Sequence, residues 1–166
     1  NNKSNFNFIN SGFNVRASEI SAAIGYNQFK RLNKLKNVRF INRQRIINSI
    51  KSSNKWKNQF TFIEADKKLQ PSWFGLPILI NKKFIPKKNK FLNYLNKCGI
   101  ETRPIISGNF INQKSIKLYN LNPNKLKFNG AQEIEDRGFF IGIHTDLITD
   151  KKLSFISEKL LKINEI

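Results

Sequence analysis

The sequence predicts an α+β fold in which helices pack on one face of a small antiparallel or mixed sheet. Apolar residues recur at helical spacing in the first third of the chain and again near its end. Between these regions, short runs rich in Phe, Ile and Trp alternate with turn residues, which is typical of strands. No internal repeat and no Gly- or Pro-rich linker divides the 166 residues, so we expect one compact arrangement.

A polar turn precedes the first predicted helix, which we expect over residues 18–35. Ser18 is a suitable N-cap, and Glu19 places a negative charge at the positive end of the helix dipole. Apolar residues then fall on one face at Ile20, Ala23 and Ile24.

A second helix, or a bent continuation of the first, is predicted over residues 38–52. Its apolar positions are Ile46, Ile47 and Ile50. Because charged residues of a helix usually face water, we expect three arginines to lie mostly on the solvent side: Arg39, Arg43 and Arg45.

The remainder of the chain alternates between strands and helices. Strands are predicted over residues 60–63, 73–80, 100–106 and 139–143. Helices are predicted from Pro86 through Leu95, over 131–136 and over 150–163. Pro77 argues against a central position for the second strand, because proline donates no ladder hydrogen bond. Gly99 and Thr149 are suitable caps, Gly99 at the end of one helix and Thr149 at the start of the last.

Composition narrows the class of protein. The longest apolar run is strand-sized, so we expect no membrane span and a soluble protein. A single cysteine, Cys98, has no partner for a disulfide or a metal site and favours a reducing cytoplasm. The chain contains no Met and opens on polar residues, which is compatible with a fragment of a longer protein.

The net charge of +19 raises the alternative of a basic nucleic-acid-binding module. The lysines are scattered over predicted helices and turns, without an Arg-Gly tract or interleaved aromatic residues. Asn and Ile are also abundant, so the charge fits the codon bias of an adenine- and thymine-rich genome. A positive field would equally attract a substrate that carries two phosphates.

Four motifs occur in a fixed order along the chain. They are SGFNVRASEISAAIG at 11–25, PSWFGLP at 71–77, GIETRPIISGNF at 99–110, and GFFIGIH at 138–144 followed by LIT at 147–149. In this order they resemble the DegT/DnrJ/EryC1/StrS family of pyridoxal-phosphate enzymes, which transform keto sugars carried on nucleotides. The Gly108-Asn109 element is similar to the branch of the family that dehydrates 4-keto-6-deoxyhexoses at carbon 3.

The resemblance implies the C-terminal small domain of a type I aminotransferase fold. Residues 1–35 would end the large cofactor-binding domain, and residues 36–166 would form a connecting helix and the small domain. Pyridoxal phosphate is the implied cofactor, with Asn14 and Arg16 as cofactor-binding residues and Asn14 reaching the neighbouring subunit of a homodimer. The catalytic Lys or His would lie upstream, so we expect no catalytic residue here, no metal, and an inactive isolated chain.

Three residues are candidate substrate ligands in the small domain. Arg103 offers a planar fork of donors for a phosphate or carboxylate, although an ion pair with Glu101 or Glu135 is an open alternative. Asn109 could present its amide to a sugar hydroxyl or simply form a turn. His144 could titrate near neutrality, or cap the next helix from a loop.

The resemblance therefore implies a pyridoxal-phosphate enzyme that removes the 3-hydroxyl of a nucleotide-linked 4-keto-6-deoxy sugar, for the synthesis of lipopolysaccharide or another cell-surface polysaccharide. A nucleotide-sugar aminotransferase of the same family is the first alternative. The basic nucleic-acid-binding module and a purely structural small domain remain the others.

Overall fold

The computed structural model describes residues 17–66, 68–118 and 127–166. The chain divides into two compact units, Asn1–Asn33 and Lys34–Ile166. Helix α1 (Glu19–Lys51) begins directly after Ser18, as predicted, and the Ser18 carbonyl accepts a hydrogen bond from the amide of Ala22 at 2.9 Å. The two predicted helices are one uninterrupted helix of 33 residues.

In the first unit, the described part of α1 is apolar on several sides. Its large apolar side chains are exposed: Ile20, Ile24, Tyr26, Phe29 and Leu32. Exposed apolar surface of this extent is typical of a segment that contacts further protein.

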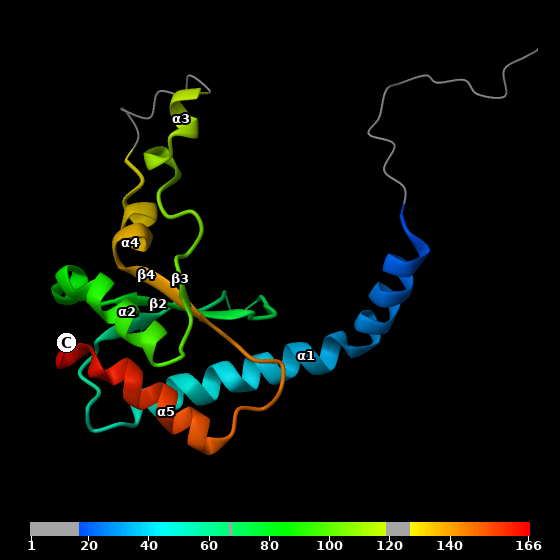
Figure 1. The fold of residues 1–166 in the computed structure, drawn as a ribbon, viewed down its shortest axis with the longest axis horizontal. Coiled ribbons are helices and arrows are strands. Elements are labelled where there is room, and N and C mark those ends of the chain that lie inside the picture. Colours follow the sequence, from blue (N-terminus) through cyan, green and yellow to red (C-terminus); the bar gives the residue numbers. More distant parts are fainter. Residues whose placement is uncertain (1–16, 67, 119–126) are drawn as a thin grey trace, which may run out of the picture. The chain divides into compact units, whose positions relative to one another are not determined.

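The second unit is built on a four-stranded sheet with the order β1-β2-β4-β3, in which every neighbouring pair is antiparallel (Figure 1). The strands are β1 (Phe60–Phe62), β2 (Gly75–Ile80), β3 (Thr102–Arg103) and β4 (Gly138–Gly142). The strand predicted over 100–106 is therefore only two residues long. Pro104 ends it, because proline has no amide to continue the ladder.

The prediction that Pro77 keeps β2 from a central position is wrong. β2 pairs with β1 on one side and with β4 on the other. The Pro77 carbonyl accepts from the amide of Ile63 at 3.5 Å, just beyond the end of β1. Because the N–H and C=O of one residue in an antiparallel strand point to the same side, the missing amide of Pro77 falls where β1 stops and costs no bond to β4.

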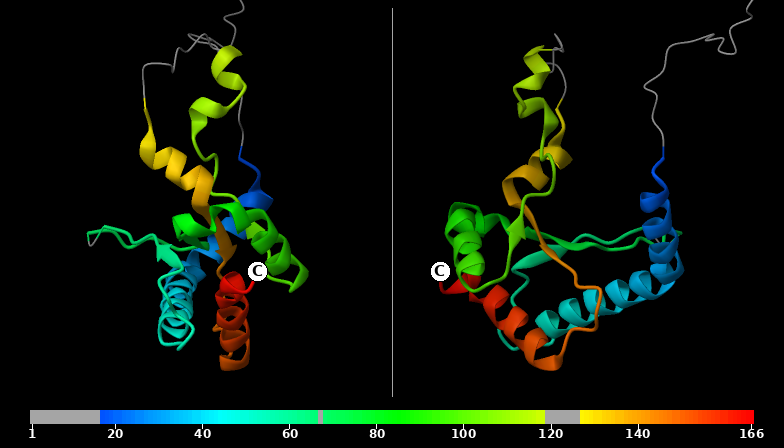
Figure 2. Two further views of the ribbon diagram at one scale, coloured as in Figure 1. Left: turned by 90° about the vertical axis from the view of Figure 1, so that its left-hand side faces the viewer. Right: turned by 45° about the vertical axis from the view of Figure 1, so that its right-hand side comes forward.

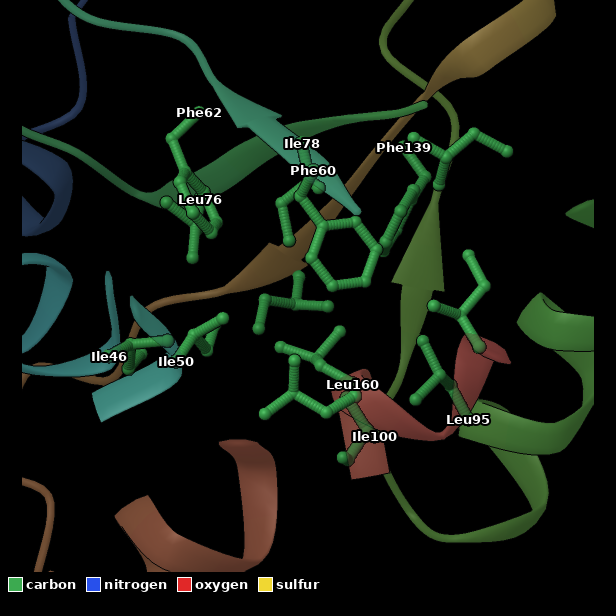
Figure 3. Packing of buried hydrophobic residues seen from close by; sticks show 14 of the residues in the cluster. Ile46, Ile50, Phe60, Phe62, Leu76, Ile78, Leu95, Ile100, Phe139 and Leu160 are labelled. Atoms are coloured by element: carbon green, nitrogen blue, oxygen red, sulfur yellow. The ribbon is translucent and has the colours of Figure 1, made fainter. Parts of the chain in front are cut away.

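Three helices cover one face of the sheet: the C-terminal part of α1, α2 (Lys88–Lys97) and α5 (Asp150–Leu161). Figure 3 shows Ile46 and Ile50 of α1 and Leu160 of α5 near Leu76 and Ile78 of β2. Figure 2 shows α5 beside the C-terminal part of α1, where the hydroxyls of Ser49 and Ser157 are 2.7 Å apart. This layer holds the main core of the unit.

The ends of these helices follow the predicted capping. Gly99 has a φ of +81°, the left-handed conformation expected where α2 ends. The Thr149 hydroxyl accepts from the amide of Lys152 at 3.4 Å and caps α5. Pro86, however, lies in a 3₁₀ turn (Lys82–Lys87), so α2 begins at Lys88 rather than at Pro86.

Shorter elements complete the unit. Helix α4 (Asn129–Arg137) replaces the shorter helix predicted over 131–136. Between β3 and α4, where the sequence predicts no helix, lie a 3₁₀ turn (Phe110–Asn112) and α3 (Ser115–Leu118). A last 3₁₀ turn (Lys162–Asn164) follows α5.

Polar side chains of α1 are buried against two connecting segments. This contradicts the prediction that the arginines of this helix lie mostly on the solvent side. Arg43 is only 1% exposed, donates to the Ile63 carbonyl at 2.7 Å and pairs with Glu64 at 2.9 Å. Arg45 is half-buried and donates to the Ile148 carbonyl and to Asp150. The carboxylates and carbonyls that bind these arginines come from segments outside α1. Helical periodicity alone therefore could not predict that Arg43 is buried.

Asn42 is fully buried and holds the segment between β4 and α5. Its amide donates to the carbonyls of His144 at 3.0 Å and Asp146 at 2.8 Å, and its carbonyl accepts from the Ile148 amide at 3.0 Å. One side chain therefore satisfies three main-chain groups of that segment.

We expect Asn42→Ala to lower the free energy of unfolding by about 2–3 kcal/mol, because it leaves buried main-chain groups unpaired. Urea unfolding followed by tryptophan fluorescence measures this loss. Asn27→Ala is the matched control, since Asn27 lies exposed on the same helix and donates to the Ala23 carbonyl. An equal effect of both substitutions would contradict the role of Asn42.

Candidate functional site

Two adjoining cavities lie along the Phe74 and Phe140 rings. The smaller is on the second face of the sheet, and the larger extends past the edge strand β3 to α5, whose Lys152, Phe155 and Ile156 line it. Side chains alternate along β4, so that Phe139 and Ile141 enter the core while Phe140 lies on the opposite face, half-buried. Phe74 packs edge-on against Phe140, with ring centroids 5.4 Å apart. These two rings line both cavities, of about 550 and about 420 Å³, and form a wall between them.

Arg103 lines the larger cavity. It projects from β3, which pairs with β4, and Lys152 from the first turn of α5 contributes a second cation. The Arg103 guanidinium pairs with Glu101 at 2.8 Å and remains 65% exposed at its side chain. Of the predicted alternatives, the ion pair with Glu101 is thus present, and the guanidinium keeps further donors toward the cavity.

Asn109 is turned into the protein. Asn109 is 4% exposed, and its side-chain amide donates to the Gln132 side-chain oxygen, Oε1, at 2.9 Å. Its main-chain amide donates to the Glu135 carboxylate at 2.7 Å, and Asn112 donates to the same carboxylate. This network fixes the connection after β3 to helix α4.

Gly108 is required by this contact. It has a φ of +67°, and an added Cβ would lie 3.0 Å from the Glu135 side chain. Gly108-Asn109 therefore forms a turn that packs on α4. In this geometry the asparagine stabilises the loop.

His144 lies in the segment that follows β4. Neither His144 nor Asn109 lines either of the two cavities, whereas Arg103 lines the larger one. Its side chain is 68% exposed, and its Nδ1 accepts from the Asp146 amide at 3.0 Å. This arrangement leaves Nε2 as the nitrogen that faces outward. Arg103 and Gly108-Asn109 belong to one segment of the chain, and His144 lies in another.

The predicted cofactor ligands, Asn14 and Arg16, lie outside the described residues. Among residues 17–66, 68–118 and 127–166, no group of three or more His, Cys, Asp or Glu side chains could hold a metal ion. Within the same ranges, no helix has the length and apolarity needed to cross a membrane.

Two groups near α4 have shifted pKa values. Burial lowers the pKa of Lys88, although Asp136 and Glu135 oppose this, and its ammonium donates to the Glu135 carbonyl at 2.8 Å. Hydrogen bonds from Lys82, at 2.7 Å, and from Arg137 lower the pKa of the Glu133 carboxyl. The contacts of Lys88 and Lys82 fasten α4 to the start of α2 and to the turn before it.

Sequence reasoning missed the residues that shape the site from neighbouring elements. Gln132 and Glu135 of α4 hold the turn, and Trp73 lines the smaller cavity while its ring lies 4.4 Å from the Arg43 guanidinium. The signal for Trp73 was its place in the PSWFGLP motif. Gln132 and Glu135 carried no such signal, because polar residues are common on the exposed face of a helix.

A small antiparallel sheet, covered on one face by helices and preceded by a long helix, is the arrangement of part of an aminotransferase-fold protein. The chain belongs to the DegT/DnrJ/EryC1/StrS aminotransferase family, whose sequence profile matches residues 1–160.

Curated and solved relatives place the chain near one branch. It is 28% identical over 156 residues to GDP-4-keto-6-deoxy-D-mannose 3-dehydratase of Escherichia coli O55:H7, covering 93% of this chain and 38% of that protein. An E. coli structure of this dehydratase with bound hydrated PLP superposes with a TM-score of 0.80 at 28% identity, again over 93% and 38% of the two chains.

A mutant of GDP-4-keto-6-deoxymannose-3-dehydratase with bound GDP-perosamine superposes with a TM-score of 0.77 at 28% identity, over 94% of this chain and 39% of that one. The present chain thus spans less than two fifths of the length of these relatives.

Acidification tests the contacts of α4. Because the pKa of Glu133 is lower in the folded than in the unfolded chain, its contribution to stability is complete above its ordinary pKa of 4.5 and is lost as pH falls through the folded value. We expect Glu133→Gln to flatten the fall in urea midpoint between about pH 5 and pH 3. Glu19→Gln, at an exposed position, is the control, and an unchanged profile for Glu133→Gln would contradict the assignment.

Proposed function

We propose that this chain is the C-terminal part of a pyridoxal-phosphate-dependent enzyme that removes the 3-hydroxyl of a nucleotide-linked 4-keto-6-deoxy sugar. The observation that carries the proposal is the match to 3-dehydratases over nearly the whole chain, in sequence and in fold. The exposed apolar side chains of α1 support a longer protein, since such a helix needs further protein against it.

The cofactor would be held largely outside the described residues. An asparagine amide and a guanidinium are suited to a phosphate, so Asn14 and Arg16 would contact the cofactor phosphate, Asn14 from the neighbouring subunit of a homodimer. Pyridoxal phosphate, when bound, supplies an electron sink for bond breaking beside the keto carbon. The Lys or His that acts directly on the substrate would be contributed by the remainder of the protein.

The described residues would bind and orient the sugar nucleotide. Arg103 would bind an anionic or hydroxyl-bearing part of the substrate from the larger cavity. Gly108-Asn109 would set the shape of the adjoining turn through Glu135, and His144 would offer Nε2 to a hydroxyl group. The single Cys98 supports a cytoplasmic location, and the product would serve cell-surface polysaccharide synthesis.

An assay of the full-length protein separates the proposed reaction from its nearest alternative. The protein is incubated with pyridoxal phosphate, glutamate and GDP-4-keto-6-deoxymannose. The mass of the sugar product is then measured by mass spectrometry. Dehydration removes the oxygen of the 3-hydroxyl, whereas transamination replaces the keto oxygen by an amine. We expect the deoxygenated product; the amine would support an aminotransferase, and an unchanged sugar would contradict both.

Substitution of Arg103 tests the role of the small domain. We expect Arg103→Ala to lower kcat/KM roughly tenfold to a hundredfold, mainly through KM, because a charge-assisted hydrogen bond to the substrate is lost. Lys97→Ala removes an exposed cation at the end of α2 and should leave both constants unchanged. Equal constants for wild type and Arg103→Ala would favour a purely structural small domain.

A further inference from the structure

The smaller cavity is an apolar groove on the second face of the sheet. It has a volume of about 420 Å³. We call it the aromatic groove; its lining residues are Pro71, Ser72, Trp73, Phe74, Gly75, Pro77, Ile105, Ile106 and Phe140. We propose that the aromatic groove binds the apolar edge of a 6-deoxyhexose, the edge that ends in the C6 methyl group. This inference rests on the proposed function and adds the surface that recognises the 6-deoxy position of the sugar.

The lining suits a neutral, apolar part of a ligand. None of the nine lining residues carries a charge, and Ser72 is the sole hydroxyl among them. The volume lies within the range of small-molecule pockets, which are mostly apolar with a few polar groups. A methyl group gains from such a lining, whereas a hydroxymethyl group would lose its hydrogen bonds to water without replacement.

The groove is held in shape by contacts on its far side. The Arg43 guanidinium lies 4.4 Å from the centre of the Trp73 ring, and Arg43 is itself fixed by Ile63 and Glu64. A Cβ at Gly75 would lie 2.6 Å from the Phe140 ring, so the glycine is required for that ring to lie against the strand. The walls are therefore preorganised, which reduces the entropic cost of binding.

The groove adjoins the larger cavity. Phe74 and Phe140 line both, and the charged residues of the larger cavity are two cations, Arg103 and Lys152, and one carboxylate, Glu101, which pairs with Arg103. Ile105 and Ile106 of the groove follow Arg103 along the chain by two and three residues. A ligand with an anionic part and an apolar edge matches this division of charge, as a sugar nucleotide does. Ile106 is 87% exposed at the groove, so its substitution can be made without disturbing a core.

Matched ligands test the inference on the full-length protein. Isothermal titration compares hexoses that differ only at C6, GDP-6-deoxymannose against GDP-mannose and dTDP-6-deoxyglucose against dTDP-glucose. We expect the 6-deoxy member of at least one pair to bind roughly tenfold more tightly. Ile106→Ser should reduce this ratio to about twofold while binding of GDP or dTDP alone is unchanged. Leu118→Ser, the same kind of exchange at an exposed site outside the groove, should preserve the ratio.

The outcomes separate this inference from the proposed function. Equal affinity for both members of each pair, with sugar nucleotides still bound, would overturn the groove assignment alone. Failure to bind any of the four sugar nucleotides would contradict the proposed function and the inference with it. A changed oligomeric state for Ile106→Ser with an unchanged ratio would show that a second copy of the chain covers the groove, and would also overturn the assignment.

Discussion

Two consecutive buried polar residues of α1, Asn42 and Arg43, are the constraint on which the second unit depends. Removing a guanidinium and an amide from water is costly unless each finds partners. Arg43 finds them in the segment between β1 and β2, and Asn42 in the segment between β4 and α5. Because these segments are far apart in sequence, one turn of one helix fixes the entry to β2 and the exit from β4. The two central strands are thus set against the same helix.

The same constraint reaches the candidate site. Arg43 contacts Trp73, so the residue that anchors the connection before β2 also supports one wall of the aromatic groove. The opposite wall is supported independently, since Glu135 of α4 fixes the turn at Gly108 and Asn109. Helices α1 and α4 therefore position the short connecting segments that form the site. A rigid scaffold commonly positions functional loops in this way.

The sequence predicted what depends on neighbouring residues and misjudged what depends on distant ones. Helix α5 was predictable because its cap, Thr149, and its apolar stripe are local. The length of β3 was overestimated because the local sequence says nothing of the point at which pairing with β4 ends. In the site, the motif around Arg103 and Asn109 was visible in the sequence. The partners that turn the Asn109 amide inward lie on α4, 23 and 26 positions away, and no local pattern could reveal them.

The ion pairs of the structure limit what the high positive charge implies about the ligand. Many carboxylates of the described residues are engaged by cations, as Glu64, Glu133 and Glu165 are, so the excess lysines leave a general positive field. Such a field attracts any polyanion. A nucleic-acid strand, however, requires a continuous track of cations with stacking platforms along it. The cations at the site instead border a cavity of about 550 Å³ lined in part by aromatic rings, a volume suited to one small anionic ligand rather than to a strand.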